Sequence, residues 1–170
     1  MSRSAPDHRI PVGVVVERRK ATSPWIEFVW RAVAVLPGVP DTAPWTRLEG
    51  DDSATRFFLD TAEVALFRGD TARYRDNLAS GAPAVWVVLR PTDAEPPLAL
   101  VLVTADPSEG EARTEAGNDL VEMVAMPAPL CEAVAAFVAE HHVEQTFFKR
   151  KRDRSNPEAL ARRGRKDESS

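Results

Sequence analysis

Cysteine is nearly absent from this chain of 170 residues, because Cys131 is the only one. A lone cysteine forms neither an intramolecular disulfide nor a C-x-x-C site, so a reducing compartment is the simplest interpretation. Long apolar runs are missing as well. No stretch approaches the roughly 20 apolar residues that span a bilayer, and the short run Val12–Val16 ends in charged residues. We therefore expect a cytoplasmic protein without a membrane segment or a signal peptide.

Motifs that carry chemistry are also missing. The chain contains no G-x-x-x-x-G-K-[ST], G-x-G-x-x-G or G-x-S-x-G sequence. His141 and His142 are adjacent on an expected helix, so their side chains point about 100° apart and cannot share one metal ion. The paired carboxylates Asp51 and Asp52 fall in a polar, solvated stretch. We predict no catalytic residue, no metal site and no cofactor, and leave open a pocket that only the tertiary structure would form.

Alternating and wholly apolar segments predict six or seven short strands. The segments Ala84–Arg90 and Leu98–Thr104 are separated by a seven-residue, proline-rich loop, which indicates an antiparallel hairpin. Residues 37–54 and 105–118 are polar and are expected to be loops. The expected strands are Pro11–Arg18, Phe28–Leu36, Arg56–Leu59, Ala62–Arg68, Ala84–Arg90, Leu98–Thr104 and Leu120–Met126.

The best helix pattern lies in Pro127–His142, where apolar residues recur at helical spacing from Leu130 to His141. A shorter helix is expected from Asp70 to Ala79. Because several strands follow one another without an intervening helix, we predict an α+β fold. It would be a mainly antiparallel sheet with the one longer helix packed on a face. The expected organisation is a flexible N-terminus (1–9), a single domain (10–144) and a basic, largely disordered or partly helical tail (145–170).

Charge is divided unevenly between the domain and the tail. Residues 145–170 hold nine Lys/Arg and four Asp/Glu, a net charge of +5. That leaves 13 basic and 22 acidic residues, a net charge of −9, for residues 1–144. We predict that the tail is an arm that orders on an acidic partner surface, with two phenylalanines as apolar anchors and the cations as charge pairs. The candidate partner-binding residues are Phe147, Phe148, Lys149, Arg150, Lys151, Arg152, Arg154, Arg162 and Arg163.

Two other interpretations of this arm stay open. It is a solvated tail without a partner, or it binds the phosphates of a nucleic acid. The acidic domain argues against the second, because it would repel a long polyanion. A protein partner, or the protein's own acidic domain, fits the charges better.

Four tryptophans are numerous for a chain of this size. Trp30 and Trp86 lie in expected strands and are expected in the core. Trp25 and Trp45 each follow a proline in a turn. They are either lids over the sheet edge or exposed anchors for a partner.

Four segments carry a resemblance to a known family: Ile10–Trp25, Val33–Gly38, Tyr74–Arg90 and Phe147–Arg163. They resemble small uncharacterised bacterial proteins, mainly proteobacterial, that are encoded beside formate dehydrogenase genes. The resemblance spans about residues 9–163. It implies an accessory role in the maturation or function of a molybdenum- or tungsten-containing formate dehydrogenase. The implied partner is a formate dehydrogenase subunit or a second small accessory protein.

Some relatives in this resemblance carry the name of the guanylyltransferase that completes the molybdopterin dinucleotide cofactor. Such an enzyme has a glycine-rich nucleotide loop after its first strand, whereas here the first expected strand runs into Glu17–Lys20. Our leading hypothesis is a non-enzymatic accessory protein that binds a protein partner. The alternatives are a nucleic-acid-associated regulator that uses the basic arm, and an enzyme or carrier in molybdopterin cofactor handling.

Overall fold

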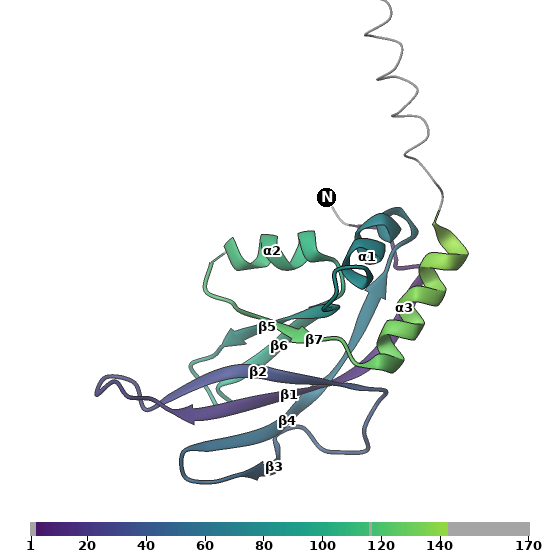
Figure 1. The fold of residues 1–170 in the computed structure, drawn as a ribbon. Helices are drawn as coiled ribbons and strands as arrows, with labels where there is room; N and C mark the ends of the chain where they lie inside the picture. The colour runs from purple at the N-terminus through teal and green to yellow at the C-terminus, as the bar shows by residue number, and fades with distance from the viewer. Residues whose placement is uncertain (1–2, 116, 143–170) are drawn as a thin grey trace, which may run out of the picture.

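A computed structural model describes residues 3–115 and 117–142, which form seven strands and three α-helices (Figure 1). The α+β class predicted from the sequence is confirmed. A single 3₁₀ turn, Arg68–Asp70, precedes the first helix. In chain order the elements are β1 (His8–Lys20), β2 (Phe28–Pro37), β3 (Thr46–Gly50), β4 (Ala54–Leu66), α1 (Thr71–Leu78), β5 (Ala84–Pro91), β6 (Leu98–Thr104), α2 (Pro107–Glu115), β7 (Leu120–Ala125) and α3 (Ala128–His141).

The strands form two antiparallel sheets, whereas the sequence predicts one. The four-stranded sheet has the order β2-β1-β4-β3, and the three-stranded sheet has the order β6-β5-β7. The β5–β6 hairpin is confirmed. The segments Arg56–Leu59 and Ala62–Arg68, predicted as two strands, lie largely within one strand, β4, which ends at Leu66. Asp60 and Thr61 interrupt the apolar pattern, but both are exposed and stay paired with β1.

The prediction of a loop over residues 105–118 is wrong, because α2 occupies its centre. Asp106 accepts a hydrogen bond from the Ser108 N–H (2.9 Å), and Pro107 begins the helix. An aspartate followed by proline favours the start of a helix, because the carboxylate caps the first N–H groups and proline suits the first helical position. Gly110 lets α2 lie against Trp86, since a Cβ there would be 2.2 Å from the Trp86 Cγ. The helix therefore covers β5.

The prediction of a loop over residues 37–54 is wrong in one part. β3 lies within it, as an edge strand of the four-stranded sheet. All five of its residues are exposed, so no apolar alternation marks it in the sequence. Asp51 holds the following turn by accepting hydrogen bonds from the N–H groups of Ser53 (2.8 Å) and Ala54 (3.0 Å).

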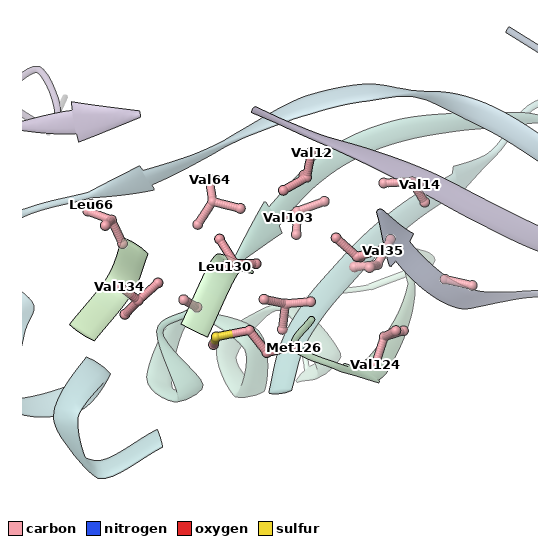
Figure 2. Packing of buried hydrophobic residues seen from close by; sticks show 14 of the residues in the cluster. Val12, Val14, Val35, Val64, Leu66, Val103, Val124, Met126, Leu130 and Val134 are labelled. Atoms are coloured by element: carbon pink, nitrogen blue, oxygen red, sulfur yellow. The ribbon is translucent and has the colours of Figure 1, made fainter. Parts of the chain in front are cut away.

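Both sheets and α3 contribute to one core. Figure 2 shows Val12, Val64 and Val103 gathered around Leu130. The apolar stripe predicted for the longer helix is confirmed, because Leu130, Val134, Phe137 and Val138 are all buried. The helix thus packs its stripe against the four-stranded sheet and α1, and the packing leaves the opposite end of the sheet free of helices (Figure 1).

The segment ahead of β1 is attached to the domain. Asp7 accepts hydrogen bonds from Arg68, and Arg3 forms an ion pair with Asp70. His8 and Arg9, which we had assigned to a flexible terminus, are the first residues of β1. None of the helices in residues 3–115 and 117–142 combines the length and apolar character needed to cross a bilayer.

Candidate binding site

The β1–β2 hairpin extends beyond the end of β5, so the four-stranded sheet is longer than the three-stranded sheet (Figure 1). Residues opposite each other in a sheet share a face. Arg18 is opposite Trp30, and Phe57 is opposite the buried Val16. The inner face of the sheet, apolar in the core, therefore continues to the hairpin end with a cation and aromatic rings.

An open groove of about 690 Å³ lies on this part of the sheet. We call it the aromatic groove. One wall comes from the loop between β5 and β6, and the rest comes from β1, β2, β4 and the segment ahead of β3. Its lining residues are Arg18, Glu27, Phe28, Trp30, Trp45, Phe57, Glu95, Pro96 and Pro97.

Three rings pack together in the groove. Trp30 meets Trp45 edge to face, with centroids 5.4 Å apart and planes at 89°. Phe57 lies 5.9 Å from Trp30 and 5.8 Å from Trp45. Edge-to-face contacts of this kind hold rings in fixed positions. The apolar surface of the groove is therefore preorganised.

Trp45 has an unusual backbone. Its φ is +67°, in the left-handed region that large side chains rarely adopt. The conformation is supported by a hydrogen bond from the Trp45 N–H to the carbonyl of Phe58 (2.7 Å). Backbone strain placed where a ring enters a groove is a feature of binding sites.

Arg18 is the cation inside the groove, and it is half-buried. Its guanidinium carbon lies 4.5 Å from the Phe28 ring centroid, 5.3 Å from that of Phe57 and 5.9 Å from that of Trp30. Within residues 3–115 and 117–142 this guanidinium has no hydrogen bond and no carboxylate within 4.0 Å. Arg18 is thus held by rings, with its N–H donors unused by those residues.

The cations beside Arg18 are engaged elsewhere. Arg19 donates to Glu17 (3.0 Å), and Arg56 donates to the second oxygen of the same carboxylate (3.4 Å). Burial would raise the pKa of Glu17, but the hydrogen bonds from these two guanidiniums outweigh it and lower the pKa. Glu17 therefore stays charged on the outer face, opposite to the groove.

Thr92 holds the proline wall of the groove in place through two hydrogen bonds. Its hydroxyl donates to the carbonyl of Pro96 (2.7 Å), and its N–H donates to the carbonyl of Pro97 (2.8 Å). Glu27 and Glu95 stand at the rim and are exposed to solvent. The groove thus has an apolar interior, one internal cation and two rim carboxylates.

An exposed apolar tip adjoins the groove. Trp25, between β1 and β2, is 91% exposed, and the neighbouring Ile26 is 55% exposed. The next two residues in the chain, Glu27 and Phe28, line the groove itself. These exposed apolar side chains beside the groove make this end of the sheet a candidate contact surface.

A charged cluster between α1 and α2 is internally satisfied. Arg73 bridges Asp70 and Asp106, with its Nε 2.9 Å from Asp106. Asp106 also caps α2, so this cluster joins the two helices. The described residues contain no group of three or more His, Cys, Asp or Glu side chains arranged to hold a metal ion.

The structure tests the tryptophan expectations in part. Trp86 packs under α2 and Trp30 lies in the groove wall, and both are half-buried rather than in the centre of the core where we expect them from the sequence. Trp45 lies over the sheet, and Trp25 is exposed. Sequence reasoning missed Arg18, Phe28 and Phe57, because only the strand register brings them together.

The predicted arm residues lie outside the described residues, the last of which is His142. Their proposed contacts therefore remain a prediction. The residues concerned are Phe147, Phe148, Lys149, Arg150, Lys151, Arg152, Arg154, Arg162 and Arg163.

The family model described as "Protein of unknown function (DUF3305)" matches residues 11–152, which include both sheets, all three helices and the first part of the basic arm. No curated protein and no solved structure matches the chain.

Proposed function

The chain belongs to the DUF3305 family, and we propose that it is a non-enzymatic accessory protein that holds an extended segment of a protein partner. The observation that carries this proposal is the aromatic groove beside the exposed Trp25 tip. Binding energy at protein interfaces concentrates in Trp, Tyr and Arg side chains that are seated beside a pocket. This end of the sheet presents such residues on a rigid frame.

A polypeptide segment suits the groove and the exposed tip together. The lining residues Glu27 and Phe28 directly follow Trp25 and Ile26 in the chain, so a ligand that used both the groove and the tip would be elongated. Aromatic rings and prolines offer flat surfaces on which an extended chain packs well, as in grooves that bind polyproline II segments. A segment in this conformation loses little further entropy on binding.

The identity of the partner is proposed from the resemblance rather than from the fold. Proteins of this type are encoded beside formate dehydrogenase genes, which supports a formate dehydrogenase subunit or a second small accessory protein as the partner. The role would be in the maturation or function of that molybdenum or tungsten enzyme. The basic arm is proposed as a second contact, through the cations that follow Phe147 and Phe148.

Copurification tests the proposal. The full-length tagged chain is expressed with the formate dehydrogenase subunits and the second accessory protein of its source organism. We expect Trp25→Ala to lower the recovered partner about tenfold, as for an interface hot spot. Met123→Ala is the matched control, because Met123 is 67% exposed but lies on β7, away from the groove. Recovery that Trp25→Ala leaves undiminished would contradict the proposal.

The arm is tested in the same assay with the full-length chain. Changing Lys149, Arg150, Lys151 and Arg152 to glutamine removes charge without shortening the protein. We expect weaker recovery and a weaker dependence of recovery on salt, since exposed charge pairs are screened by ions. Unchanged recovery at low salt would show that the arm does not contact the partner. The groove would then be the only contact that we propose.

A further inference from the structure

This inference deepens the proposed function and rests on it, because it concerns which segment the aromatic groove accepts. The starting observation is the state of Arg18. Three rings surround its guanidinium, and its N–H donors meet no acceptor in the described residues. Arg19 and Arg56, its neighbours on the other face, both bind Glu17.

A guanidinium stacked on rings keeps its in-plane N–H donors for other partners. Arginine carries five such donors in a fork that matches a carboxylate with two parallel hydrogen bonds. Half-burial strengthens a charge-assisted hydrogen bond relative to one in open water. The strongest complement to the interior of the groove is therefore a single carboxylate.

The rim sets a second condition. Glu27 and Glu95 are exposed on the groove lining, and no cation lies within 4.0 Å of either carboxylate among residues 3–115 and 117–142. A run of acidic residues would therefore be repelled at the rim, whereas a basic residue there would be attracted. The rings and Pro96 and Pro97 favour apolar residues between the two charges.

We propose that the aromatic groove binds an extended partner segment in which one aspartate or glutamate is flanked by proline or aromatic residues, with a basic residue at the rim. The acidic side chain pairs with Arg18, and the flanking residues pack on Trp30 and Trp45. The chain's own arm is a poorer occupant, because Lys149–Arg152 directly follow its phenylalanines and would bring like charge to Arg18.

Selection from a random peptide library displayed on phage, with the full-length protein as bait, tests this specificity. We expect selected peptides to contain one acidic residue beside proline or an aromatic residue. That acidic residue should be enriched about tenfold over its frequency in the starting library. Bait with Arg18→Gln should lose the acidic preference and keep the apolar one. Bait with Arg31→Gln is the matched control, because Arg31 is exposed on the opposite face of β2.

Direct binding of a selected peptide completes the test. Replacing its acidic residue by the amide should weaken binding about tenfold to the wild-type protein and not at all to Arg18→Gln. The Arg18→Glu protein should instead prefer the peptide with lysine at that position. A thermal melt of each variant shows whether it is folded, and the charge reversal separates lost pairing from lost structure.

Every other result counts against the inference. Selected peptides without an acidic residue, or with the Phe-Phe-basic order of the chain's own arm, would overturn it, as would the absence of any enrichment. These failures differ from failure of the proposed function, which is measured by recovery of the partner with Trp25→Ala. An intact Trp25 effect together with peptides that lack an acid would retain the function and discard the role of Arg18.

Discussion

Trp30 and Trp45 come from opposite edges of the four-stranded sheet. Their rings meet edge to face over its middle strands, with centroids 5.4 Å apart. Trp30 is on the edge strand β2, and Trp45 directly precedes the other edge strand, β3. Arg18 and Phe57 come from the two strands between them. The contact closes the inner face of the sheet into a groove without a helix over it.

The positive φ of Trp45 predicts the relative stability of two variants at this position. At φ +67° a residue with a side chain is strained, and glycine is not. Both Trp45→Ala and Trp45→Gly should destabilise the protein, because each removes the ring contacts. We expect the glycine variant to be more stable than the alanine variant by about 1 kcal/mol in urea unfolding. The reverse order, which is usual in helices, would contradict the strained backbone.

The packing of α2 on β5 predicts a large effect of one methyl group. Gly110→Ala should lower the free energy of unfolding by about 1–3 kcal/mol, because its Cβ would lie 2.2 Å from the Trp86 ring. In an exposed helix the same change stabilises. Gly69→Ala is the control, since a Cβ there meets nothing within 4 Å. Equal stability of the two variants would show that α2 does not press on Trp86.

Asn77 joins α1 to the strands through a buried side chain. Its Nδ2 donates to the carbonyls of Ala84 (2.8 Å) and Ala105 (2.9 Å), and its Oδ1 accepts from the Ala84 N–H (3.0 Å). Asn77→Ala should cost about 3 kcal/mol in chemical unfolding, because it leaves buried backbone groups unpaired. The neighbouring exposed Asp76→Ala should cost little. A small loss at Asn77 would contradict this account of the packing.

The lowered pKa of Glu17 predicts how the free energy of unfolding depends on pH. Burial would raise its pKa, but hydrogen bonds from Arg19 and Arg56 lower it below the usual 4.5. A carboxyl with a lowered folded-state pKa stabilises the protein above its unfolded-state pKa and loses that contribution as pH falls through the folded-state value. Glu17→Gln should therefore reduce stability at pH 7 and flatten its fall below pH 4.5. If the free energy of unfolding depended on pH in the same way for the wild-type protein and for Glu17→Gln, this expectation would be contradicted.

The fold was predictable where a local pattern exists. The strands β1, β2, β5, β6 and β7 and the helix α3 were found from alternation, apolar runs and the stripe that begins at Leu130. β3 was missed because all its residues are exposed, and the division into two sheets depends on strand pairing that no local pattern encodes. The site could not be predicted for the same reason, since only the pairing register of β1 with β2 and β4 brings Arg18 and Phe57 together.

The most direct test of the groove is an NMR titration that follows the indole N–H signals of the four tryptophans. The full-length protein is titrated with a peptide selected on it. The signals of Trp30 and Trp45 should shift, while that of Trp86, packed under α2, should stay in place. Binding that leaves Trp30 and Trp45 unmoved would contradict the assignment of the aromatic groove as the binding site.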